Sequence, residues 1–284
     1  MTIFRLGLIG YPLSHSLSPQ IHSAALNACG LEGDYSLFPI LPADKQGLID
    51  LLNRVRIGEL HGLNVTIPHK QTVIDFLDEL TPTARAIGAV NTIYVRDVNL
   101  IGGNTDAPGF LTDLKRFLAE SPSPNGRGAG VREKSVLVLG AGGSARAVVY
   151  ALLNDGWNVT LAARKIDQAQ QLASSFPNFP IPITNLQTFE PSTFNLMVNT
   201  TPLGMTPNVD RSPLPENLSL PSNAFVYDLV YNPKETKLVR DAQAQGLKAA
   251  TGLGMLIEQA ALSFELWTGH NPSREIIRAS VSNL

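Results

Sequence analysis

Two charged residues in this sequence are placed where they could carry out acid–base chemistry, each just beyond an apolar segment. Lys70 ends NVTIPHK (64–70), in which alternating apolar residues predict a strand that Pro68 terminates. Asp106 stands in GGNTDAPGF, between a glycine turn and an expected helix start. A lysine and a carboxylate brought into one site can move a proton, as general acid–base catalysis requires. Taken alone, Lys70 is also compatible with a solvated surface residue, and Asp106 with a helix N-cap.

A glycine-rich turn carries the second chemical motif. VLVLGAGGSA (136–145) places Gly140, Gly142 and Ala145 in the G-x-G-x-x-G/A pattern of dinucleotide-binding proteins. An apolar strand precedes the turn and a helical pattern follows it, which is the context that this motif needs. We expect Gly140 to allow the tight turn, Gly142 to admit a pyrophosphate, and the helix N-terminus to bind the phosphates. A glycine turn without a ligand is the alternative.

The end of the following strand indicates which dinucleotide is bound. An NAD enzyme usually has an acidic residue there, which binds the ribose 2′-hydroxyl. The segment VTLAARK has none, and Arg164 and Lys165 offer positive charge for a 2′-phosphate instead. The sequence therefore favours NADP over NAD, with a merely solvated Arg164 as the alternative.

Composition narrows the class of protein. The chain has 284 residues, of which 44% are hydrophobic and 16% charged, a size that favours two domains. A net charge of −2 without a long basic run argues against nucleic acid and membrane-surface partners, and favours a small molecule. No apolar run approaches the roughly 18 residues of a membrane span, and the N-terminus predicts a strand rather than a signal peptide. We expect a cytoplasmic protein.

Metal and disulfide chemistry are not expected. Cys29 is the only cysteine, so one chain can form neither a disulfide nor a cysteine-based metal site. The spacing of His15, His22, His61 and His69 fits no regular ligand set, and acidic residues do not cluster around them. We predict no metal site, and we expect His69 to pack or to form a hydrogen bond locally.

The order of elements predicts the fold class and a domain boundary. Short apolar strands alternate with helical patterns along most of the chain, which is typical of α/β proteins with parallel sheets. The stretch 121–133, SPSPNGRGAGVRE, predicts a flexible connection, and a new strand–turn–helix–strand unit begins directly after it. GLGMLIEQAALSFELWTG predicts a terminal pair of helices. We place the boundary near residue 108.

Seven motifs together indicate a family. NVTIPHK, GAVNT, GGNTDAPGF, GAGGSARA, NTTPLGM, VYDLVYNP and GLGMLIEQAA occur in the order and approximate spacing of the shikimate dehydrogenases, which the chain resembles over nearly its whole length. The resemblance implies a reversible NADPH-dependent reduction of 3-dehydroshikimate to shikimate, a step toward chorismate and the aromatic amino acids. Lys70 matches the catalytic lysine of the family, and Asp106 its aspartate partner.

The same resemblance implies a domain organisation. A substrate domain of residues 1–108 and 252–284 would contain a parallel-rich α/β sheet completed by the C-terminal helices. A Rossmann NADP-binding domain of residues 109–251 would be inserted into it. Small-molecule ligands are the expected partners, and a monomer or a homodimer remains open.

The resemblance also implies contact residues. Ser14 and Ser16 would bind the substrate carboxylate, although these serines alone predict only a turn before Pro19. The expected contacts to the ring hydroxyls come from Thr66, Asn91, Asp106 and Gln259, with Tyr231 as a further substrate contact; Asn91 and Gln259 alone are equally compatible with structural hydrogen bonding. On the cofactor side the expected contacts are Gly140, Ala141, Gly142, Gly143 and Ser144 in the phosphate loop, Arg164 and Lys165 at the 2′-phosphate, Leu229 near the nicotinamide, and Gly252 through its backbone.

One departure from the family pattern keeps other activities open. Many members have Asn-Arg-Thr after the second strand and a further basic residue three positions later. This chain has Ala163, Arg164 and Lys165, with Gln168 at the later position. NADP preference is therefore expected to be weaker than usual, and a quinate/shikimate dehydrogenase using both NAD and NADP remains an alternative. A catalytically silent NADP-binding regulator is the third hypothesis.

Overall fold

The computed structural model describes residues 2–120, 134–186, 194–216 and 218–282, so the predicted connection at 121–133 lies outside the described residues. The chain divides into two compact units, a first unit of residues 1–106 and 257–284 and a second unit of residues 107–256. Two helices contain the divisions, α5 (Asp106–Ala119) and α9 (Leu253–Thr268). The domain boundaries expected from the sequence, after residues 108 and 251, stay predictions.

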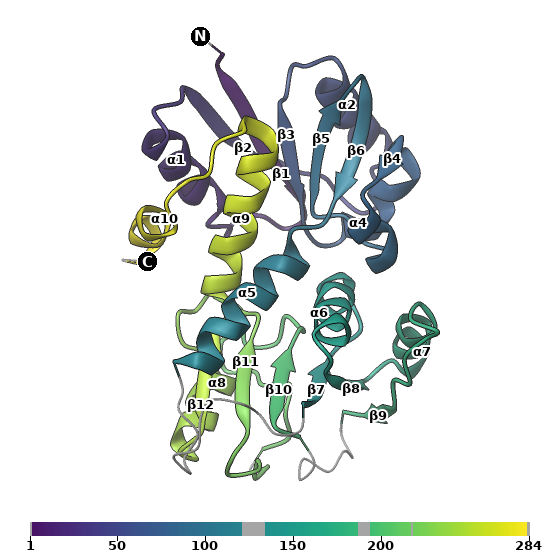
Figure 1. Ribbon diagram of the computed structural model, residues 1–284, viewed down its shortest axis with the longest axis vertical. Helices are drawn as coiled ribbons and strands as arrows, with labels where there is room; N and C mark the ends of the chain where they lie inside the picture. The colour runs from purple at the N-terminus through teal and green to yellow at the C-terminus, as the bar shows by residue number, and fades with distance from the viewer. Residues whose placement is uncertain (1, 121–133, 187–193, 217, 283–284) are drawn as a thin grey trace. The chain divides into compact units, whose positions relative to one another are not determined.

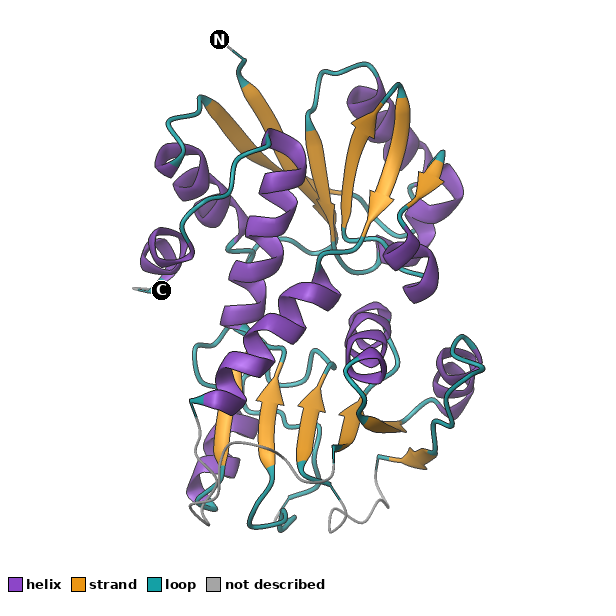
Figure 2. Cartoon of the chain, in the orientation of Figure 1, coloured by secondary structure: helices purple, strands orange, loops and turns teal. Residues whose placement is uncertain are grey.

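The first unit contains a mixed six-stranded sheet in the order β2-β1-β3-β5-β6-β4. Strands β1 and β3 are parallel, whereas β5 is antiparallel to both β3 and β6 (Figures 1 and 2). The remaining elements of this unit, beside α9, are β1 (Phe4–Gly10), α1 (Ser18–Ala28), β2 (Gly33–Pro39), α2 (Lys45–Arg56), β3 (Gly62–Val65), α3 (His69–Thr72), the 3₁₀ helix η1 (Val73–Phe76), β4 (Glu79–Leu80), α4 (Pro82–Ile87), β5 (Thr92–Arg96), β6 (Asn99–Gly103) and α10 (Arg274–Val281).

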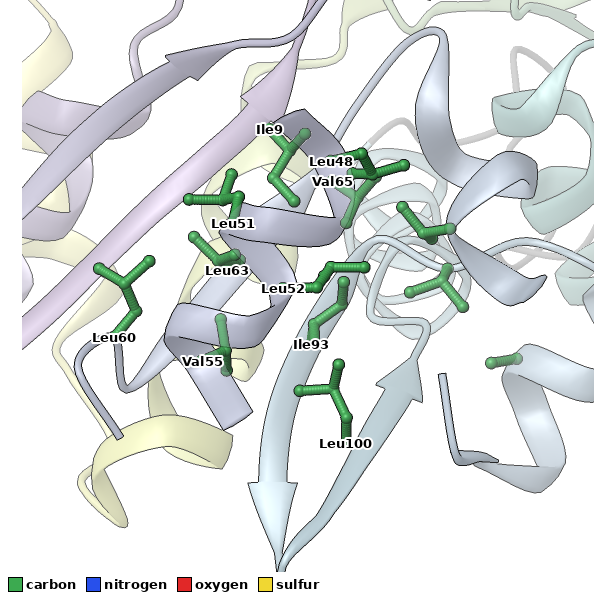
Figure 3. Close-up of a cluster of buried hydrophobic side chains, with 13 residues drawn as sticks. Ile9, Leu48, Leu51, Leu52, Val55, Leu60, Leu63, Val65, Ile93 and Leu100 are labelled. Carbon is green, nitrogen blue, oxygen red and sulfur yellow. The ribbon is translucent and has the colours of Figure 1, made fainter. Parts of the chain in front are cut away.

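The core of the first unit forms where α2 covers the sheet. Leu48, Leu51, Leu52 and Val55 recur at the spacing that places apolar side chains on one face of a helix, and all four are buried. They pack against side chains of β1, β3, β5 and β6 in one cluster (Figure 3). Helix α2 begins at its N-cap Asp44, whose Oδ1 accepts a hydrogen bond of 2.8 Å from the Gly47 amide.

The second unit is built on a parallel sheet in the order β12-β11-β10-β7-β8-β9. Read from β9, this is the strand order of the doubly wound dinucleotide-binding fold, in which the strand order reverses between β7 and β10. Its elements, beside α5, are β7 (Ser135–Leu139), α6 (Gly143–Asn154), β8 (Asn158–Ala163), α7 (Ile166–Ser174), β9 (Ile183–Asn185), β10 (Leu196–Asn199), β11 (Phe225–Asp228), α8 (Lys237–Ala244) and β12 (Lys248–Thr251).

The fold class predicted from the sequence is thus confirmed, as a two-sheet α/β protein with one Rossmann-type sheet. The terminal pair of helices also forms, as α9 and α10. No helix in the described part of the chain is long and apolar enough to cross a membrane.

Candidate active site

The direction of four strands brings the candidate residues of the first unit to one edge of its sheet. Because β1 and β3 are parallel, the segments that follow them leave at the same edge, and these carry the serines and Lys70. Strand β5 runs the other way, so Asn91 just before it lies at this edge, and the Val65 amide donates to the Asn91 carbonyl at 2.8 Å. Strand β6 ends there too, and leads into Thr105 and Asp106.

Lys70 and Asp106 form a buried ion pair at this edge. The Lys70 Nζ atom lies 2.6 Å from Asp106 Oδ2, and the two side chains are 11% and 7% exposed. Lys70 stands in the short helix α3. The Lys70 backbone carbonyl accepts a hydrogen bond of 2.7 Å from the Val90 amide, which holds the helix at this edge. The side chain is therefore not a solvated surface lysine. An ammonium and a carboxylate at this distance can hold a proton donor in a defined place.

The Asn91 side chain connects this pair to the C-terminal segment of the chain. Its Nδ2 atom lies 2.9 Å from Asp106 Oδ1 and 3.2 Å from Gln259 Oε1, while its Oδ1 accepts the Thr105 amide at 2.7 Å. Gln259 stands in α9, 168 residues away in the sequence. The structure thus brings together four of the predicted residues: Lys70, Asn91, Asp106 and Gln259.

The other predicted substrate residues of the first unit lie near the same edge. A Cβ atom at Gly10, the last residue of β1, would lie 2.4 Å from Thr66 Cγ2, so Thr66 lies against the end of that strand. Ser16 Oγ accepts the Ser18 amide at 3.2 Å, which is the turn that the sequence also allowed. Ser14 is exposed. Within the described ranges, no hydrogen bond links these three hydroxyls to the Lys70–Asp106 pair.

The glycine turn of the second unit fits a dinucleotide. Gly140 has φ +107°, and a Cβ there would lie 2.8 Å from Thr200 Oγ1, so a side chain at this position would be strained and crowded. At Gly142, which precedes α6, a Cβ would meet no atom within 4 Å, which leaves open space for a phosphate beside the helix N-terminus. The residues present therefore match the geometry that a pyrophosphate needs, at the point where the strand order reverses.

The remaining predicted cofactor and substrate residues of the second unit lie at strand ends. Arg164 and Lys165 are exposed and follow β8 directly. Leu229 follows β11 and is half-buried; Gly252 packs so closely on it that a Cβ would lie 2.2 Å from the Leu229 carbonyl oxygen. Tyr231 is half-buried, and burial raises the pKa of its hydroxyl.

Asp228, immediately before Leu229, is a buried carboxyl group that the sequence reasoning did not single out. Burial raises its pKa to about 6, while hydrogen bonds from Thr236, Val230 and Asn199 act in the opposite direction. The Thr236 hydroxyl donates to Oδ2 at 2.7 Å, and the Asn199 amide to Oδ1 at 2.8 Å. The Asn199 contact joins the ends of β10 and β11, and the Thr236 contact joins the end of β11 to the N-cap of α8, so both position the segment carrying Leu229.

Three more residues of the first-unit site were also missed: Asn64, Thr105 and Ser263. All are buried and joined by hydrogen bonds to one another or to Asn91. Asn64 and Ser263 each interrupt an apolar pattern, in β3 and on the buried face of α9, and a polar residue at such a position needs a partner. That was the available signal, but the sequence does not say which partner each one finds.

Two of the histidines, His69 and His22, make contacts that belong to the folded structure. His69 Nε2 lies 2.7 Å from the Ile40 carbonyl oxygen. His22 is fully buried and stacks on Tyr35 with ring centroids 4.3 Å apart. Burial lowers the pKa of His22 to about 3, with the nearby Asn64 side chain acting in the opposite direction. The described residues include no group of three or more potential metal ligands.

Comparisons with known proteins agree with this geometry. Three family models match: the shikimate dehydrogenase substrate binding domain over residues 8–93, shikimate/quinate 5-dehydrogenase over 126–196, and the shikimate 5′-dehydrogenase C-terminal domain over 252–281. A shikimate dehydrogenase (NADP(+)) of Carboxydothermus hydrogenoformans is 40% identical, covering 97% of this chain and 95% of its own.

Two solved structures are similar along the whole chain. Shikimate 5-dehydrogenase from Thermus thermophilus, in complex with NADP(H) and shikimate, has a TM-score of 0.85 and 37% identity, covering 99% of both chains. Quinate dehydrogenase from Corynebacterium glutamicum, in complex with NAD, has a TM-score of 0.85 and 32% identity, also covering 99% of both chains. These matches, together with the Lys70–Asp106 pair, show that the chain belongs to the shikimate dehydrogenase family.

Proposed function

We propose that this protein catalyses the reversible reduction of 3-dehydroshikimate to shikimate with NADPH. The observation that carries this proposal is the buried Lys70–Asp106 pair, which stands beside Asn91 and Gln259 at the carboxyl edge of the first sheet. The curated relative from Carboxydothermus hydrogenoformans has this activity in its name, and the Thermus thermophilus relative was solved with both ligands.

The pair has distinct tasks in the proposed reaction. Bound NADPH supplies a hydride to the ketone carbon. Lys70 donates a proton from Nζ to the ketone oxygen, which becomes the new hydroxyl group, and takes the proton back in the reverse direction. Asp106 holds the ammonium group by a charge-assisted hydrogen bond and helps to orient the substrate.

We assign the binding residues as follows. Ser14 and Ser16 bind the substrate carboxylate, Thr66, Asn91, Asp106 and Gln259 bind its hydroxyl groups, and Tyr231 is a further substrate contact. In the second unit, the loop from Gly140 to Ser144 holds the pyrophosphate, Arg164 and Lys165 the 2′-phosphate, and Leu229 and Gly252 the nicotinamide end. The proposed roles of the two units follow: a substrate domain that includes the C-terminal helices, and an inserted NADP-binding domain.

A second candidate, dehydrogenation of quinate with NAD, is favoured by two observations. A quinate dehydrogenase solved with NAD has the same TM-score, 0.85, as the Thermus thermophilus shikimate enzyme, and Gln168 stands where many shikimate dehydrogenases have a basic residue. A silent regulator is disfavoured because a buried ammonium–carboxylate pair costs desolvation energy, which a protein without catalysis has less reason to keep.

The deciding experiment crosses shikimate and quinate with NADP and NAD and follows nicotinamide absorbance. We expect the highest kcat/KM with shikimate and NADP. A higher value with quinate and NAD would replace the main proposal with the second. No turnover in any combination, with NADP binding intact by calorimetry, would support the regulator.

Location and assembly complete the proposal. We place the enzyme in the cytoplasm. A chain with a single cysteine forms no internal disulfide, so its folding does not depend on an oxidising compartment. Light scattering coupled to size-exclusion chromatography distinguishes the two proposed assemblies, monomer and homodimer.

A further inference from the structure

A chain of buried polar side chains leads from Asp106 into the interior of the first unit. Ser263, on α9, is fully buried, and its Oγ atom lies 3.0 Å from Thr105 Oγ1 and 3.0 Å from Asn64 Nδ2. Thr105 contacts the Asn91 side chain, which in turn contacts Asp106. Asn64 receives a hydrogen bond of 2.8 Å from the Tyr35 hydroxyl. None of these contacts involves an exposed side chain.

Donor and acceptor chemistry gives this chain a single direction. Asn64 Oδ1 accepts from Tyr35, so its Nδ2 is the group that donates to Ser263 Oγ. Ser263 must then give its own hydrogen elsewhere, and in the part of the chain that the structure describes the acceptor in reach is Thr105 Oγ1. Thr105 Oγ1 accepts from Asn91 Nδ2 at 2.9 Å and donates its own hydrogen to Asn91 Oδ1, at 3.3 Å.

The donor-to-acceptor direction of these hydrogen bonds decides how the Asn91 side-chain amide is oriented. Its Oδ1 faces two donors, the Thr105 amide at 2.7 Å and the Thr105 hydroxyl at 3.3 Å. Its Nδ2 therefore faces two acceptors, Thr105 Oγ1 and Asp106 Oδ1, each at 2.9 Å. If the Thr105 hydroxyl instead pointed away from Asn91, the amide would lose one of the two donors that hold it. The Asp106 carboxylate would then have a less well fixed neighbour.

We propose that Ser263 is a positioning residue for the reaction: by fixing the Thr105 hydroxyl it orients Asn91, and through Asn91 it holds Asp106 in line with Lys70. This inference rests on the proposed function, because it assumes that the Lys70–Asp106 pair performs the chemistry. No hydrogen bond in the described ranges joins Ser263 to Lys70 or Asp106. Its partners in the described ranges are Asn64 and Thr105.

The alternative is that Ser263 only satisfies buried polar groups and so stabilises the fold. The two roles differ in what they change. A purely structural role lowers stability and leaves turnover per folded enzyme unchanged. A positioning role lowers kcat while NADPH binding, which belongs to the second unit in the proposed function, keeps its affinity. Misplacement of a catalytic group by a remote change can cost up to about 100-fold in rate.

The test compares variants that remove a hydroxyl group belonging to this series of hydrogen bonds with a variant that removes a buried hydroxyl group outside it. We expect Ser263→Ala and Thr105→Val each to lower kcat roughly 10-fold at temperatures where both variants are folded, with the NADPH dissociation constant unchanged. Thr105→Ser, which keeps the hydroxyl, should restore most of the rate. The matched control is Thr92→Val: Thr92 is fully buried, and among the described residues its Oγ1 has no hydrogen-bond partner. That variant should keep wild-type kcat.

Two double variants test whether the path is the one proposed. Because Ser263 and Thr105 act through one hydrogen bond, Ser263→Ala with Thr105→Val should be no slower than the slower single variant. In an Asp106→Asn background, Ser263→Ala should cause no further loss. An equal further loss there would mean that Ser263 does not act through Asp106, and would overturn the inference.

The outcomes separate this inference from the function on which it rests. If Lys70→Ala and Asp106→Asn turn over at least about 100-fold more slowly than wild type while Ser263→Ala stays within about twofold of it, the positioning role is wrong and the proposed function stands. If Lys70→Ala and Asp106→Asn turn over normally, the proposed function itself is wrong. If Ser263→Ala does not fold, the Thr105→Val and Thr105→Ser pair gives the same decision.

Discussion

Lys70 and Asp106 depend on each other for stability as well as for the proposed chemistry. Removing one partner of a buried ion pair leaves the other charge without compensation, typically at a cost of about 3–5 kcal/mol. Here Asp106 would keep its hydrogen bond from Asn91, and both side chains keep some exposure, so we expect a cost at or below the lower end. Variants of this pair must therefore be assayed per folded enzyme.

Lys70→Ala removes the proposed proton donor. We expect kcat to fall by about 10²–10⁴-fold, the usual contribution of a positioned acid or base. NADPH affinity should barely change, as measured by fluorescence titration. The matched control is Lys237→Ala, which breaks an exposed lysine–aspartate pair of 2.8 Å on α8. Normal turnover of Lys70→Ala with weak NADPH binding would make Lys70 a cofactor ligand instead.

Arg164→Ala removes the proposed 2′-phosphate contact. A hydrogen bond to a charged group contributes about 1.5–3 kcal/mol, so NADP binding should weaken by that amount. NAD binding should stay nearly unchanged, because NAD has no phosphate at that position. Calorimetric titration of both cofactors measures the difference, with the exposed Arg240→Ala on α8 as a control. Equal losses for NADP and NAD would contradict the assignment.

At the scale of elements, the hairpin between β5 and β6 has an unfavourable turn residue. Arg96 pairs with Asn99, so the loop is two residues long, and both loop residues have positive φ: 49° at Asp97 and 70° at Val98. Such turns favour Asn-Gly or Asp-Gly, because a β-branched side chain is strained at positive φ. The Val98 side chain is 81% exposed and so gains little from packing.

Val98→Gly should therefore stabilise the protein, although glycine at this position also increases the entropy of the unfolded chain. We expect the free energy of unfolding to rise by about 0.5–1 kcal/mol, as measured by urea denaturation. Val95→Gly is the control, because Val95 lies inside β5, where glycine weakens a strand. A loss of stability in both variants would show that the turn is not strained.

At the scale of the whole molecule, acid stability depends on a buried group in each unit. Burial lowers the pKa of His22 from 6.5 to about 3, so the unfolded state binds a proton that the folded state does not between those values. Stability from neutral His22 is complete above pH 6.5 and is lost as the pH falls toward 3. Asp228 acts in the opposite sense, since its raised pKa of about 6 favours the folded state as the pH falls through 6.

His22→Phe should remove this acid sensitivity. Between pH 7 and pH 5, wild type should lose about 2 kcal/mol of unfolding free energy relative to the variant, because each pKa unit corresponds to about 1.4 kcal/mol. Phenylalanine suits the site, where the ring stacks on Tyr35 near Phe264 and Trp267. Urea denaturation at each pH measures the difference, with exposed His270→Phe as the control. Parallel pH curves for wild type and His22→Phe would refute it.

Part of this protein follows from the sequence alone, because it depends on local physics. The turn at Gly140 needs a residue that tolerates positive φ, and the glycine pattern of the neighbouring residues is enough to predict this turn. The alternation of strands and helices predicted the α/β class for the same reason, since periodicity is a property of short segments. Lys70 and Asp106 could be identified as candidate acid–base residues. The local sequence did not separate that role from two common alternatives, a surface lysine and a helix N-cap.

The tertiary structure decided which of these groups meet. Strand β5 runs antiparallel to its neighbours, and this reversal brings Asn91 to the edge where Lys70 and Asp106 lie. Gln259 and Ser263 reach the site from α9, and no pattern within α9 specifies partners so far away in the chain. Hydrogen bonds between distant segments depend on strand order and direction, which packing of the whole first unit determines. Local sequence therefore supplied the chemical groups, and the folded sheet supplied their contacts.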